Sequence, residues 1–103
     1  MFKEAIHDLS RRPDADVTGA IQHALAGLEC AIRDKCGDNA TLGKLLNDYP
    51  DLLPKPLNEA AKKVWGYASE MARHLEEGRT PTIEQAELVV SMAASISTYI
   101  TKT

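Results

Sequence analysis

The chain has 103 residues and a formal net charge of −3 at pH 7, and although 44% of its residues are hydrophobic, only 5% are aromatic. This length fits one domain, and an alanine-rich, aromatic-poor composition is typical of helices that pack closely on one another. The negative charge excludes a global positive field that would attract nucleic-acid backbones, and no apolar run is long enough to cross a bilayer.

The chain begins with a short amphipathic pattern. One side of a helix here carries Phe2, Ile6 and Leu9. No capping residue precedes the pattern, and Pro13 breaks it. We interpret residues 1–12 as an N-terminal helical segment, compatible with the tail of a longer helix that begins upstream, and residues 13–103 as a single helical-bundle domain.

A first long helix is predicted from about Asp16 to Cys36. Asp14 or Asp16 can cap its first turn, and Gly37 is suited to end it in a left-handed conformation. A core stripe repeats at i, i+4 and i+7 and comprises Val17, Ile21, Ala24, Leu25, Leu28 and Ile32.

The opposite side of this helix carries a second stripe, made mostly of small residues. Its members are spaced four, three and four apart and are Gly19, His23, Ala26 and Cys30. A helix that is apolar or small on two sides is usually packed on two sides. We therefore expect the stripe to meet another helix of the chain or a second subunit, and we predict it as the interface of a homodimer.

A short helix is predicted from about Thr41 to Tyr49. Its inward side carries Leu42, Leu45 and Leu46. Prolines 50, 54 and 56 then make a rigid connection to the next helix.

The second long helix is predicted from about Pro56 to Glu77, with Gly78 at its end. Its inward stripe comprises Leu57, Ala61, Val64, Ala68, Met71, Ala72 and Leu75. We interpret Trp65 and Tyr67 as core and interface anchors, because no cluster of Lys or Arg surrounds them as base stacking on nucleic acid would require.

The third long helix is predicted from Ile83 to about Thr101, and Thr82 with Gln85 forms a capping-box pattern before it. Its broad apolar stripe comprises Ala86, Val89, Val90, Met92, Ala93, Ile96, Tyr99 and Ile100. No segment alternates in the manner of a strand. The sequence therefore predicts an all-α, up-and-down bundle of about four helices, three long and one short, with short connections.

The cysteines and histidines indicate neither a disulfide nor a metal site. Cys30 and Cys36 fall around a predicted helix end, where a disulfide is geometrically unfavourable, and neither has metal-ligand spacing. His23 and His74 stand on separate helices without a carboxylate motif. We expect reduced thiols in a cytoplasmic protein with no metal and no cofactor.

His74, near the end of the second long helix, is the first candidate for chemistry. Glu70 one turn earlier can orient its ring, and Arg73 lies beside it in the chain. The alternative is a solvated histidine near a helix C-terminus, which the spacing alone favours. The residues predicted to complete a binding site around this pair are Tyr67, Ser69, Glu70 and Arg79.

Five segments together follow a family-like pattern: Thr18–Glu29, Thr41–Leu45, Trp65–Ser69, Arg73–His74 and Ala86–Val90. In these segments the chain resembles the small HEPN-type helical domains of bacterial abortive-infection and toxin–antitoxin proteins. The match is closest to a group that often forms the C-terminal part of longer uncharacterised bacterial proteins. The resemblance covers nearly the whole chain from about Arg12, and it implies a bundle that dimerises with sites at the subunit boundary.

Active members of this family are metal-independent ribonucleases that use an arginine, the polar residue after it and a histidine further on, from both subunits. The resemblance places His74 as the histidine, Ser69 as the polar residue and Ala68 at the arginine position. The methyl group of Ala68 cannot stabilise the charge that develops on a phosphate. Arg73 lies about 100° around the helix from His74 and is a poor geometric substitute.

Two functions therefore stay open. The first is a non-catalytic helical interaction or assembly domain, homodimeric and with a protein partner, in a bacterial defence-like protein. The second is a metal-independent ribonuclease or RNA-binding domain that uses His74 and Arg73 at a dimer cleft. Ala68 and the acidic charge favour the first function, and the same charge disfavours RNA as a partner.

Overall fold

The computed structural model describes residues 2–10 and 16–103, without the side chains of residues 7–10 and 72–74. Within these ranges the chain forms helices and no strands. The helices are α1 (Phe2–Ser10), α2 (Val17–Cys36), α3 (Leu42–Asp48), α4 (Asn58–Glu76) and α5 (Ile83–Lys102). The predicted all-α bundle is confirmed, and the N-terminal segment adds a further helix to it.

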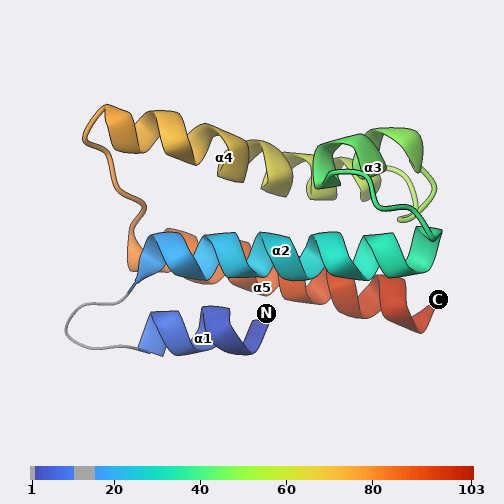
Figure 1. The fold of residues 1–103 in the computed structure, drawn as a ribbon, viewed down its shortest axis with the longest axis horizontal. Coiled ribbons are helices and arrows are strands. Elements are labelled where there is room, and N and C mark those ends of the chain that lie inside the picture. The colour runs from blue at the N-terminus through green and yellow to red at the C-terminus, as the bar shows by residue number, and fades with distance from the viewer. Residues whose placement is uncertain (1, 11–15) are drawn as a thin grey trace.

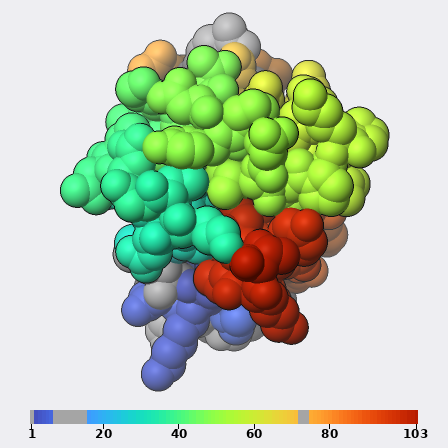
Figure 2. Space-filling model, turned by 90° about the vertical axis from the view of Figure 1, so that its right-hand side faces the viewer, coloured from blue at the N-terminus to red at the C-terminus, as the bar shows by residue number. Residues whose placement is uncertain are grey.

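The bundle is built around the pair α2 and α5, which pack side by side (Figure 1). α1 lies along one side of this pair and α4 along the other, at an angle to α2 (Figure 1). α3 packs on α2 and α4 at the end of the molecule where α2 finishes. Figure 2 shows this end, where α3 and the connection to α4 form one continuous surface beside the C-terminal end of α5.

The ends of α2 follow the predicted caps. Asp16 Oδ1 accepts a hydrogen bond from Gly19 N at 2.8 Å. A Cβ added at Gly19 would lie 2.3 Å from Asp16 Oδ2, so any larger residue there would make the capping side chain of Asp16 shift. At the other end, Gly37 has a φ of 62° and its N–H donates to Arg33 O at 2.8 Å.

The predicted core stripe of α2 is confirmed. Every member is buried except Val17, which is half-buried against the core. The largest fully buried side chains of the bundle are Ile21, Leu28, Ile32, Leu45 and Ile100. One polar side chain joins this core, and it is satisfied locally because Ser97 Oγ donates to Ala93 O at 2.8 Å.

Three side chains predicted to face inward are exposed instead. Leu57 is 56% exposed because α4 begins one residue later, so Leu57 precedes the helix rather than lying on its stripe. Leu75 is 37% exposed near the end of α4, and Tyr99 is 41% exposed on α5. Ala72, a further predicted member of the α4 stripe, lies outside the described side chains.

α1 packs on both α2 and α5. Ala5 is fully buried and Phe2 is half-buried, whereas Ile6 is exposed. Leu9 lies outside the described side chains. The small Ala5 lets α1 approach the central pair closely, since no long side chain separates the two backbones.

The predicted capping box at the start of α5 is present. Thr82 Oγ1 accepts from Gln85 N at 3.1 Å, and Thr82 N donates to Gln85 Oε1 at 2.9 Å.

We expect Thr82→Ala to lower the free energy of unfolding by about 1 kcal/mol, because an N-terminal donor of the helix loses its acceptor. Urea denaturation followed by circular dichroism measures this. Ser91→Ala, an exposed serine of the same helix, is the control, and equal stability of the two variants would contradict the role of the cap.

Candidate functional site

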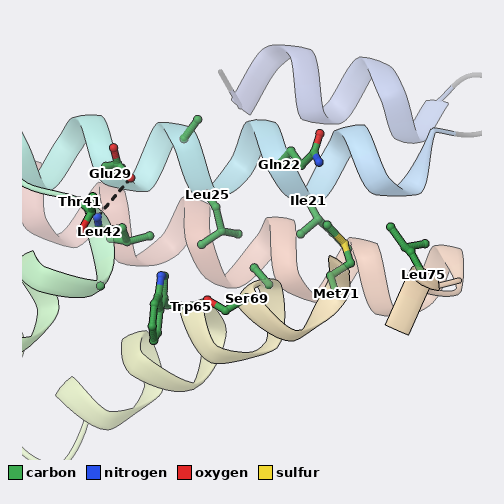
Figure 3. Close-up of a pocket in the computed structure, with 13 residues that line it drawn as sticks. Ile21, Gln22, Leu25, Glu29, Thr41, Leu42, Trp65, Ser69, Met71 and Leu75 are labelled. Carbon is green, nitrogen blue, oxygen red and sulfur yellow. Dashed lines mark hydrogen bonds between the residues drawn. The ribbon is translucent and has the colours of Figure 1, made fainter. Parts of the chain in front are cut away.

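A groove lined mainly by apolar side chains lies between α2 and α4, and α3 closes it at one end (Figure 3). Its volume is about 480 Å³. The apolar lining comes mainly from Ile21 and Leu25 of α2, Leu42 of α3, and Trp65, Met71 and Leu75 of α4. Polar side chains stand among and around them: Gln22, Glu29, Thr41 and Ser69.

The position of α3 at the end of the groove is fixed by two side chains of α2. Glu29 Oε2 accepts a hydrogen bond from Leu42 N at 3.2 Å, so a residue of another helix caps α3, and Thr41 at the N-cap position makes no side-chain capping bond. Arg33 forms an ion pair with Glu29 at 2.5 Å, and its Nε donates to Ala40 O at 3.0 Å. These bonds tie the loop before α3 to the last turns of α2.

Asp38 holds the same loop from its other side. Its Oδ1 accepts from Ala40 N at 2.9 Å, and its Oδ2 accepts from Tyr49 Oη at 2.9 Å. The bond to the Asp38 carboxylate, with some burial, raises the pKa of Tyr49, so the phenol stays protonated as the donor. Both ends of α3 are thereby fastened to the loop that precedes it.

Trp65 forms a wall of the groove and rests on α3. Its side chain is 40% exposed, and a Cβ added at Gly43 would lie 2.6 Å from its Cζ2. A glycine in α3 is therefore what allows the indole to approach so closely. The indole also borders a second hollow of about 850 Å³ between α3 and α4, so it stands between the two depressions.

The structure divides the predicted binding residues between two sides of α4. Ala68 and Ser69 line the groove with Trp65. Tyr67 and Glu70 line the second hollow on the other flank of the helix. Basic residues, among them Lys62 and Lys63, line it as well. The groove therefore contains only part of the set that the sequence predicted.

The remaining predicted site residues are Arg79, His74 and Arg73, and none of them is among the described residues that line the groove. Arg79 is exposed, forms an ion pair with Glu77, and lies with Tyr67 in a shallow hollow before α5. The side chains of His74 and Arg73 lie outside the described residues. The described part of the chain thus supplies no geometry for a catalytic histidine.

The predicted dimer stripe on α2 lies on the open side of the helix. His23, Ala26 and Cys30 are exposed and Gly19 is half-buried, so no helix of the described chain covers the stripe. The small residues that α2 does bury lie on a different side and are Ala20, Ala24 and Gly27. Ala26 also lines the groove, which makes the stripe and the groove neighbours on one surface. His23 stands near enough to Glu4 of α1 to interact with it electrostatically.

The described residues that line the groove carry little charge. Among the described lining residues Glu29 is the only charged one, and none is Lys or Arg. In the same described ranges no group of three or more His, Cys, Asp or Glu side chains is arranged to hold a metal ion. None of the helices, as far as the structure describes them, has the length and apolarity that crossing a membrane requires.

Comparisons of the chain with family models, with curated proteins and with solved structures found no match. The candidate site therefore rests on its own geometry. The sequence missed the pairing of Gly43 with Trp65 and the contribution of Gln22, Glu29 and Leu42 to one surface. A signal was present in Gly43, a poor helix former placed inside a short leucine-bearing helix.

We expect Gly43→Ala to displace the indole of Trp65, because the added methyl group overlaps it. Trp65 is the only tryptophan, so its fluorescence emission reports this directly, and the emission maximum should shift to the red. Gly66→Ala on the next residue of α4 is the matched control, since an added Cβ there meets no atom within 4 Å. That variant should keep the native emission and gain about 0.5–1 kcal/mol in unfolding free energy from helix propensity. Native emission in Gly43→Ala would refute the close contact.

Proposed function

We propose that this chain is a non-catalytic helical interaction domain that forms a homodimer and binds a protein partner. The observation that carries the proposal is the groove between α2 and α4, which is apolar, open, and bordered by the exposed Trp65 and Leu75. Exposed aromatic and apolar side chains around a hollow are typical of protein-binding surfaces.

Ala68 favours this function over phosphoryl chemistry. Cleavage of RNA requires donors or cations aimed at the charge that develops on the phosphate. Ala68 lines the groove beside Ser69 and contributes only a methyl group there. A relationship to HEPN-type domains remains part of our proposal and is supported by the segments named above and by the all-helical bundle.

The proposed dimer uses the open side of α2. Ala26 and Cys30 offer a surface without long side chains, on the helix that every other described helix already contacts. Gly19 is weaker evidence for the dimer than its place in the stripe suggests. A Cβ at this position would meet the capping side chain of Asp16, so its small size also has a local role. Ala26 is therefore the residue that tests the interface best.

We expect the native chain to sediment as a dimer at tens of micromolar protein, and Ala26→Arg to sediment as a monomer with unchanged helicity, because a buried, unpaired charge opposes association. Ser91→Arg, on an exposed position of α5, should remain a dimer. A native chain that is monomeric throughout this range would overturn the dimer.

Alkylation of the two cysteines gives a second readout of the same interface. Cys30 is exposed in the stripe, whereas burial, and then the charge of Asp38, raises the pKa of Cys36 and slows its reaction. The alkylation rate of Cys30 should fall as the protein concentration rises, while that of Cys36 stays constant. Equal behaviour of both thiols would place the interface elsewhere on the molecule.

An RNA-cleavage assay in EDTA tests the alternative function. We expect no cleavage by the native chain or by His74→Ala, with both proteins folded as judged by circular dichroism. Cleavage by the native chain that disappears in His74→Ala would overturn the proposed interaction domain and show a metal-independent ribonuclease.

A further inference from the structure

α3 shows what kind of element the space between α2 and α4 accepts. This short helix packs on both of them. Its buried side chains are Leu42, Leu45 and Leu46. They stand at i, i+3 and i+4, which is one face of a helix. The seam between α2 and α4 thus already holds one helix through leucines at helical spacing.

The groove continues the interface that α3 makes with these two helices. Leu42 of α3 belongs to both this interface and the groove, because it is buried and also lines the groove. Beyond it the walls keep the same character, with Leu25 on α2 and with Met71 and Leu75 on α4 (Figure 3). Within the described chain no helix fills this part of the seam.

We propose that the groove binds an amphipathic helix of a partner protein, laid against α2 and α4 as an extension of α3. The partner helix presents apolar side chains at i, i+3, i+4 and i+7 to the groove. This inference rests on the proposed function as an interaction domain and gives the chemistry of the partner.

The edges of the groove are polar and carry little free charge. Gln22 and Glu29 stand on the α2 edge, and Ser69 stands on the α4 edge. Glu29 is the only charged side chain among the described lining residues and is already paired with Arg33. The apolar face of the partner helix is therefore the feature that the groove recognises.

Two polar atoms at the groove can fix the orientation of the bound helix. Trp65 and Ser69 are both exposed at the groove, and Figure 3 shows the indole nitrogen on the α2 side of its ring. Trp65 combines such a donor with a large apolar face, which suits an anchor for a partner side chain.

The test uses synthetic peptides without aromatic residues and follows the emission of Trp65. The first peptide carries leucines at helical spacing on a lysine background, and the second has the same composition with its leucines scrambled. We expect a saturable blue shift with the first peptide, with a Kd in the micromolar range. The scrambled peptide should give no shift.

Two arginine variants of exposed serines place the binding in the groove. Ser69→Arg puts a long cation into the groove and should weaken the first peptide at least about tenfold. Ser91→Arg, on the exposed side of α5, should bind it as the native chain does. The proposal is overturned by an absent shift, by an equal shift with the scrambled peptide, or by native binding in Ser69→Arg.

The outcome is separable from that of the proposed dimer. Sedimentation of the protein alone measures self-association, so a monomer that binds the peptide would refute the dimer and keep the helix-binding groove. A blue shift that grows with protein concentration in the absence of peptide would assign the groove to a second copy of the chain and overturn a separate partner.

Discussion

α2 is the element on which the rest of the bundle depends, because every other described helix packs against it. It packs most extensively on α5, and its fully buried side chains include Ile21, Leu28 and Ile32. α1 and α4 take the two flanks (Figure 1). Three sides of one helix are therefore occupied within the chain, and only the side that carries Ala26 and Cys30 stays open. Any surface for a partner that includes α2 has to start from that side.

The bonds that hold α3 on α2 determine where the groove ends. Glu29 receives the first free N–H of α3 and is itself held by Arg33. With about a third of each side chain exposed, the ion pair contributes less than about 1 kcal/mol by itself. Its importance is geometric, because a buried or half-buried helix end needs acceptors and Glu29 supplies one for Leu42 N. Once α3 is fixed there, Gly43 fixes where Trp65 can lie, and the end of the groove is closed.

Local signals predicted the fold well, and tertiary contacts account for what they missed. The caps at Asp16 and Thr82 and the left-handed Gly37 involve neighbours within four residues, so the sequence alone carries them. The contact of Gly43 with Trp65 joins positions on two helices, and no pattern within either helix contains it. Gly19 lies in the predicted stripe and also contacts the Asp16 cap, so its small size has a local role that the stripe pattern did not include. The predicted site around His74 goes beyond the described side chains, and only Ser69 and Ala68 of its neighbours reach the groove.

The seam between α2 and α4 stays open because the side chains of Ala68 and Ser69 on the α4 edge are small. Leu25 and Met71 on its floor are already buried, whereas the single tryptophan beside them is 40% exposed. Removing apolar surface from water stabilises an assembly by about 25 cal/mol per Å². Small residues on an edge, an exposed aromatic anchor and an apolar floor are the arrangement that a second helix completes, since its side chains supply the volume that the chain omits.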